Sequence, residues 1–104
     1  MSERAAPEIP AVDELLHEPA RLKLLAILSV VKRTDFTYLL RISGLSKGNL
    51  SVQMSRLSDA ELVVIDKSFQ GNRPRTMYQL TQAGRQALRA YKKNMLAILE
   101  ALPD

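Results

Sequence analysis

The sequence contains no cysteine and no tryptophan, and it holds only two phenylalanines and three tyrosines. The absence of cysteine excludes disulfide bonds and thiolate metal sites, and it agrees with a reducing compartment. No apolar run approaches the ~20 residues of a membrane span, because the longest, residues 24–31, is interrupted by Ser29. The N-terminus also lacks the basic start and apolar stretch of a signal peptide. We therefore expect a soluble cytoplasmic protein, not associated with a membrane, whose core is made of aliphatic side chains.

Charge is distributed unevenly along the 104 residues, a length that suits one compact domain. Residues 1–20 hold five acidic side chains and one basic one, which gives a net charge of −4. Residues 21–104 hold fourteen basic and six acidic side chains, which gives +8. Such an excess of positive charge attracts polyanions. Charge alone leaves a generic soluble surface and a nucleic-acid-binding surface equally open, so the positions of the basic residues have to decide.

Residues 19–57 have the pattern of three helices. Pro19 suits the first position of a helix over residues 20–31, whose apolar residues lie on all sides and predict a central, buried helix. A second helix over 36–45 ends at Gly44, and Ser46 caps the next one. That third helix places apolar residues at spacings of four and three, which predicts one buried stripe. Two helices joined by a tight turn form a helix-turn-helix. The residues of the stripe are Leu50, Met54 and Leu57.

After residue 61 the period changes to that of strands. The pattern predicts two strands over residues 62–69 and 76–80, and the Gly- and Pro-containing segment 70–74 is predicted to form the turn between them. Thr81 caps a last helix over 82–102. The sequence thus predicts a mostly helical α+β fold, a winged helix-turn-helix: a three-helix unit, a β-hairpin wing and a long C-terminal helix. We divide it into a flexible leader (1–11), a DNA-binding unit (12–81) and a dimerisation helix (82–104) within the same compact domain.

Four segments resemble the winged-helix regulators of the MarR and ArsR types, and most closely their short stand-alone members. These segments are HEPARLKLL (17–25), LSKGNLS (45–51), RLSDAELV (56–63) and GNRPRTMYQLTQAGR (71–85). The resemblance spans roughly residues 15–100 and implies a prokaryotic, DNA-binding transcriptional regulator. Such proteins usually have glycine at the position of Glu61, so Glu61 is expected either to adopt left-handed backbone or to end its helix differently. Their metal-sensing members carry Cys pairs and His or Asp clusters, whereas this chain has only His17, expected as a backbone cap or surface residue. No metal or cofactor is expected.

The third helix is predicted to be the recognition helix. If the apolar stripe faces inward, the opposite face is polar and suits the major groove. Gln53 and Asn49 can pair with adenine, Arg56 with guanine, and Val52 can touch a thymine methyl. The other members of the face suit phosphates at the helix N-terminus, although any solvated helix can carry such residues. The predicted contacts are Ser46, Lys47, Asn49, Ser51, Val52, Gln53 and Arg56.

The turn between the two strands is basic. Asn72, Arg73 and Arg75 surround Pro74, and such a loop can lie along phosphates or insert an arginine into a narrow minor groove. An ordinary basic hairpin tip is the alternative. Lys67 on the first strand suits either a phosphate contact or mere solubility.

The last helix carries an apolar stripe at coiled-coil spacing. The stripe predicts homodimerisation, because a domain of this size has little core to receive it. Packing against its own domain is the alternative. The predicted dimer residues are Leu88, Tyr91, Met95, Ile98, Leu99 and Leu102.

The sequence shows no arrangement of a nucleophile with a base, so no catalytic residue and no enzymatic activity are expected. We expect a homodimeric, sequence-specific regulator of double-stranded DNA, acting as a repressor at the nucleoid. A winged-helix module that binds proteins without DNA specificity is the alternative. No residue pattern indicates a small-molecule effector.

Overall fold

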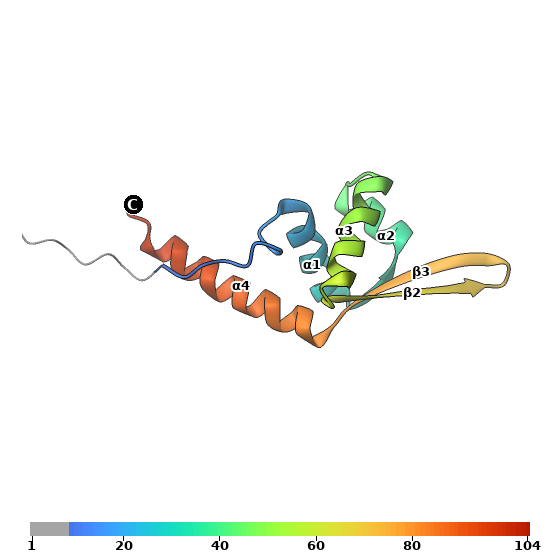
Figure 1. The fold of residues 1–104 in the computed structure, drawn as a ribbon. Coiled ribbons are helices and arrows are strands. Elements are labelled where there is room, and N and C mark those ends of the chain that lie inside the picture. Colours follow the sequence, from blue (N-terminus) through green and yellow to red (C-terminus); the bar gives the residue numbers. More distant parts are fainter. Residues whose placement is uncertain (1–8) are drawn as a thin grey trace, which may run out of the picture.

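A computed structural model describes residues 9–104 of the chain. The three N-terminal helices form a bundle, the two long strands extend away from it as a hairpin, and the last helix runs toward the other end of the molecule (Figure 1). The predicted winged helix-turn-helix fold is confirmed. The elements are α1 (Pro19–Val31), β1 (Arg33–Asp35), α2 (Phe36–Ser43), α3 (Lys47–Asp59), β2 (Val63–Gln70), β3 (Arg73–Leu80) and α4 (Gln82–Ala101).

Most of the predicted leader, residues 1–8, lies outside the described residues. Its last residues lie along α4, where the Asn94 side chain donates a hydrogen bond to the Ala11 carbonyl over 3.3 Å. A short turn follows and places Leu16 in the core with no exposed surface. Residues 11–18 therefore belong to the folded domain.

Side chains at the helix starts satisfy backbone N–H groups that the helices leave free. Glu18 accepts from the amides of Ala20 and Arg21 at the start of α1, with Pro19 as its first residue. Asp35 caps α2 by accepting from Tyr38, and Ser46 caps α3 by accepting from the amide of Asn49. Pro19 at the first helical position and the predicted caps at Gly44 and Ser46 are all present, and Gly44 ends α2 with a φ of 71°.

The core lies where α1 crosses α2 and α3 and meets the base of the hairpin. Leu24, Leu25 and Leu28 of α1 have no exposed surface, as predicted for a central helix. The α3 stripe is equally buried, and Tyr78 and Leu80 close the core from the sheet. No described helix is long and apolar enough to cross a bilayer. The buried α3 residues are Leu50, Met54 and Leu57.

The sheet has three strands in the order β1-β3-β2, all antiparallel. The segment that forms β1 is a strand, whereas the sequence predicted only a polar break there. Three polar residues have no strand pattern of their own, and they become a strand because β3 offers its free edge over residues 77–79. This pairing ties the connection between α1 and α2 to the hairpin.

The exit from α3 uses left-handed backbone at Glu61, one of the two conformations expected, with a φ of 63°. The amide of Glu61 donates to the Ser58 carbonyl and that of Leu62 to the Leu57 carbonyl, both over 2.9 Å, which is a Schellman motif. Thr81 then donates from its hydroxyl to the Glu61 carbonyl over 2.8 Å. The end of α3 and the start of α4 are thereby fixed to each other.

Substitutions at two glycines, each in the first turn of a helix, test how closely α4 approaches the base of the hairpin. A Cβ on Gly84 would lie 2.6 Å from Cδ1 of Leu80 and against the Leu62 carbonyl, whereas a Cβ on Gly48 would meet nothing within 4 Å. Gly84→Ala should therefore lower the free energy of unfolding by about 1–3 kcal/mol. Gly48→Ala, the matched control, should raise it by up to about 1 kcal/mol. Urea unfolding followed by circular dichroism measures both, and equal effects would contradict the close approach of α4 to the hairpin base.

Candidate nucleic-acid interface

The outward face of α3 carries small polar and basic side chains. Lys47 and Arg56 are exposed near opposite ends of the helix, and Ser51, Ser55 and Val52 are exposed between them. Half of the surface of Val52 is free, on a face that otherwise has no large apolar group. Ser55 was not predicted as a site residue, although it lies one turn after Ser51 and could have been found by that spacing. The hydroxyl of Ser46 is occupied by its capping bond to the Asn49 amide.

The two amide side chains of this helix are bonded to each other, and one of them is also bonded to α1. Nε2 of Gln53 donates to Oδ1 of Asn49 over 3.0 Å, and Oε1 of Gln53 accepts from the guanidinium of Arg21 over 3.0 Å. Both amides are half-buried. Part of the hydrogen-bonding capacity of Gln53 and Asn49 is therefore used inside the domain, beside a buried arginine from α1, and their contact with DNA stays a prediction.

Arg21 connects the N-terminal turn, α1 and α3. It is only 9% exposed, its Nε donates to the Leu15 carbonyl over 2.6 Å, and it lies 3.9 Å from the carboxylate of Glu18. A buried cation is tolerated only where its donors are used and an opposite charge is near. Together these contacts fix the rotation of α3 about its axis relative to α1. We call Glu18, Arg21, Gln53 and Asn49 the Arg21 network.

The carboxyl group of Glu18 is held in its charged form. Hydrogen bonds from the amides of Arg21 and then Ala20 lower its pKa below the usual 4.5, and the positive charges of Arg21 and Arg56 add to this effect. Arg56 belongs to the outward face of α3. Glu18 thus links the start of α1 electrostatically to that face.

The wing is longer and more regular than predicted. β3 begins at Arg73, so the connection is the two-residue turn Gly71-Asn72, in which Gly71 has a φ of 64°. Arg73 and Arg75, predicted in a loop, are strand residues. Pro74 lies between them in β3, where β1 is too short to reach, so the amide that proline lacks is not needed by a neighbouring strand.

Strand alternation divides the wing into two faces. The face away from α3 carries Arg75, which donates to Gln70 over 2.9 Å and lies 3.9 Å from the carboxylate of Asp35. Arg33 and Asp66 form a 3.1 Å ion pair on the same face. Arg73 is exposed and makes no ion pair or side-chain hydrogen bond with any residue between 9 and 104. Arg73 is therefore more available to a ligand than Arg75.

The other face of the wing looks toward α3. We call it the helix-side face, and it begins in the core and continues to the tip. A cleft of about 230 Å³ separates it from α3, with Ser51 and Ser55 on one wall and Lys67 and Thr76 on the other. Its members, in cross-strand pairs, are Val63 and Leu80, Ile65 and Tyr78, Lys67 and Thr76, and Phe69 and Pro74.

The cleft is lined by hydrogen-bond donors rather than by metal ligands. Its polar groups are hydroxyls and one ammonium, which suit the oxygens of a phosphate. Burial raises the pKa of Tyr78, so its hydroxyl stays protonated at neutral pH. Within the described part of the chain, no three His, Cys, Asp or Glu side chains are arranged to hold a metal ion. Lys67 had been predicted with two possible roles, and Thr76 had not been singled out.

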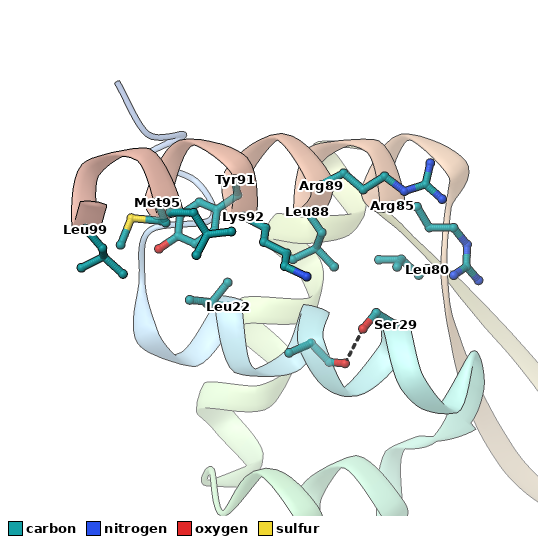
Figure 2. A pocket seen from close by; sticks show the side chains of 12 residues that line it. Leu22, Ser29, Leu80, Arg85, Leu88, Arg89, Tyr91, Lys92, Met95 and Leu99 are labelled. Carbon is teal, nitrogen blue, oxygen red and sulfur yellow. Dashed lines mark hydrogen bonds between the residues drawn. The ribbon is translucent and has the colours of Figure 1, made fainter. Parts of the chain in front are cut away.

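A second surface lies between α1 and α4. Figure 2 shows side chains of both helices pointing into this space, with Leu22 on one side and Leu88, Met95 and Leu99 on the other. The groove has a volume of about 520 Å³, and Arg85, Arg89 and Lys92 also line it. We call it the α1–α4 groove.

The residues of the predicted dimer stripe differ in their exposure to solvent. Tyr91 is only 8% exposed and shares a 2.8 Å hydrogen bond with Nδ1 of His17, so it packs mainly within its own core, at the wall of the groove. Leu88 and Met95 are half-buried against the same core. Leu99 and Leu102 remain more than half exposed, and Leu96 is 48% exposed although it was not predicted.

Comparison with known proteins places these features in context. A family model described as "Winged helix DNA-binding domain" matches residues 20–99. Over 85 residues the chain is 28% identical to an uncharacterized protein of Methanocaldococcus jannaschii, covering 82% of this chain and 92% of that protein.

Two solved structures extend the comparison. The transcriptional regulator homologue protein from Pyrococcus horikoshii OT3 has a TM-score of 0.82 at 24% identity, over 88% of this chain and 91% of its own. The AntR antimony-specific transcriptional repressor has a TM-score of 0.61 at 25% identity, over 85% and 74%. The predicted fold and the predicted resemblance to winged-helix regulators are thus confirmed.

The Arg21 network gives a pH dependence that can be measured. Because the folded state lowers the pKa of Glu18, its charge stabilises the fold above the ordinary pKa of 4.5, and this contribution is lost as the pH falls through the lowered value. The stability advantage of the wild type over Glu18→Gln should therefore shrink as the pH falls below 4.5 and be absent once the pH is below the lowered pKa. Urea unfolding at each pH measures it, with Glu14→Gln at an exposed position as the control. A difference that stays constant with pH would contradict the assignment.

Proposed function

Because the chain belongs to the winged helix DNA-binding domain family, we propose that it is a sequence-specific transcriptional regulator of double-stranded DNA that acts as a homodimeric repressor. The observation that carries the proposal is the outward face of α3, which combines exposed basic and hydroxyl side chains with a helix N-terminus and a wing beside it. An α-helix fits the major groove, and its N-terminal amides and positive dipole favour phosphate.

In this arrangement the outward face of α3 reads the bases. Arg56 suits guanine, Val52 a thymine methyl, and Ser51 and Ser55 either bases or phosphates. Lys47, at the first position of the helix, suits a phosphate. Asn49 and Gln53 support this face through the Arg21 network, and Gln53 acts mainly as a positioning residue because both ends of its amide are bonded.

The cleft between α3 and the wing is proposed to bind the sugar-phosphate backbone of one DNA strand, and we call it the proposed phosphate seat. When a helix lies in the major groove and a wing reaches the adjacent minor groove, the backbone that separates the two grooves passes between them. Lys67, Thr76, Ser51 and Ser55 line that passage with donors. Arg73 and Asn72 at the wing tip then lie near the minor groove or its far phosphates.

The α1–α4 groove and the exposed end of α4 are the proposed dimer surface, with a second copy of this chain as the occupant. Leu96, Leu99 and Leu102 leave a large apolar area uncovered near the C-terminal end of a 20-residue helix. Coverage by a two-fold partner would place two α3 helices on successive major grooves, about 34 Å apart. Occupying such a site blocks other proteins from it, which supports repression on the chromosome, and a relative by structure is a repressor.

Salt dependence tests the DNA interface. Replacement of a phosphate-contacting lysine should reduce the slope of log affinity against log salt by about 1, because fewer counterions are released. We expect this of Lys47→Ala and Lys67→Ala, measured by fluorescence anisotropy with a duplex selected from a random pool. Lys93→Ala on α4 removes the same charge elsewhere and should leave the slope unchanged. A wild type whose affinity hardly varies with salt would favour a protein-binding module instead.

Sedimentation tests the dimer. Leu99→Glu places a charge in the proposed interface without disturbing a fully buried residue, so it should shift the mass from twice 11.7 kDa to 11.7 kDa. Val30→Glu, on an α1 residue that is 79% exposed and outside the α1–α4 groove, is the control and should remain dimeric. If Leu99→Glu sediments like the wild type, α4 is not the dimer helix.

A further inference from the structure

The tip of the wing carries an apolar pair that the fold does not use. Phe69 is 76% exposed, and its direct cross-strand partner Pro74 is exposed as well. Neither belongs to the core or packs against it. The hairpin that carries the pair extends well beyond the helices (Figure 1). Water is therefore in contact with one of only two phenylalanines in the chain.

The apolar pair lies on the face of the wing that is turned toward α3. Phe69 and Pro74 are the outermost pair of the helix-side face, the same face that forms the wall of the cleft. The next pair toward the core is Lys67 and Thr76, which is the pair proposed to meet the phosphate strand. The apolar tip therefore follows directly on the proposed phosphate seat, on the surface that α3 also faces.

The spacing along the strand matches the dimensions of DNA. Phe69 lies two residues beyond Lys67, which is about 7 Å along an extended strand. The minor groove is about 6 Å wide. A side chain one pleat beyond a phosphate contact thus lies over the groove rather than over the backbone that bounds it.

The backbone of the tip that carries the ring is constrained. Pro74 fixes its own φ and stands opposite the phenyl group, and the turn is the shortest that joins two antiparallel strands. Arg73, next to Pro74 in β3 but on the opposite face of the wing, makes no ion pair with residues 9–104 and adds positive charge to the tip. Minor-groove proteins insert apolar side chains as wedges between base steps and use arginine or lysine to contact the groove.

We propose that Phe69, supported by Pro74, enters the minor groove of the bound duplex, partly unstacks a base step and bends the DNA. The inference rests on the proposed function, since it requires α3 in the adjacent major groove. It goes beyond that function by assigning a specificity-determining residue outside the recognition helix. A flexible base step is easier to unstack than a stiff one, so the wedge makes the protein sensitive to sequence at positions that no polar side chain contacts.

The test compares variants on one duplex, isolated from a random pool by the wild-type protein and labelled with a fluorescence donor and acceptor at its two ends. The wild type should increase energy transfer between the ends as it bends the DNA. Phe69→Ala should lose that increase and bind about tenfold more weakly. Phe69→Leu keeps an apolar wedge and should retain most of the bend and of the affinity.

The matched control is Val64→Ala, which removes an exposed apolar side chain from the opposite face of the same strand. It should leave affinity within about twofold of the wild type and the bend unchanged. Wild-type affinity and bending in Phe69→Ala would overturn the inference while leaving the proposed function intact. A change in sedimentation of Phe69→Ala without DNA would also overturn it, by showing that the ring contacts a second copy. If the wild type selects no duplex at all, the proposed function fails first.

Discussion

The burial of one stripe of α3 against α1 decides what the rest of the molecule can do. Leu50, Met54 and Leu57 have essentially no exposed surface, so the rotation of α3 about its axis is set by the hydrophobic effect. Once that rotation is fixed, the opposite face must meet solvent or a ligand. Lys47, Arg56 and the hydroxyl groups between them lie on that face because the opposite stripe is buried.

A buried charge makes the same rotation more specific. Apolar contacts alone tolerate small rotations and shifts of a helix, whereas hydrogen bonds tolerate few. Arg21 bonds to the Leu15 carbonyl and to Gln53, and it lies near Glu18, so a rotated α3 would leave its guanidinium buried without partners. The Arg21 network therefore connects the region next to the α1–α4 groove with the proposed reading face.

The wing shows how a sheet can give two faces different tasks. Successive side chains of a strand point to opposite sides, so one face of β2 and β3 carries ion pairs and the other continues the core outward as a cleft and then an apolar tip. The three-residue β1 stabilises the base of the hairpin and leaves its outer part unpaired on that edge. This division provides a polar seat and an apolar tip within four residues of strand.

The sequence by itself determined the order of the four helices and the hairpin, the helix caps and the buried stripe of α3, because each depends on residues within a few positions of one another. Pro19, Gly44, Ser46 and the spacing of Leu50, Met54 and Leu57 are local signals of this kind. Only the tertiary structure decided the matters that depend on distant neighbours. Arg21 reaches Gln53 across 32 positions, and β1 becomes a strand only because β3 lies beside it.

Tyr91 is a second residue whose surroundings could not be predicted from the local sequence. Its spacing in α4 suited a dimer stripe, yet it is bonded to His17, which is 74 positions away in the sequence. The periodicity of a helix tells which side chains share a face, but it cannot tell whether that face meets its own domain or a partner. The whole α3 stripe packs inside its own domain. The α4 stripe is divided, with Tyr91 buried in its own core and Leu99 and Leu102 exposed.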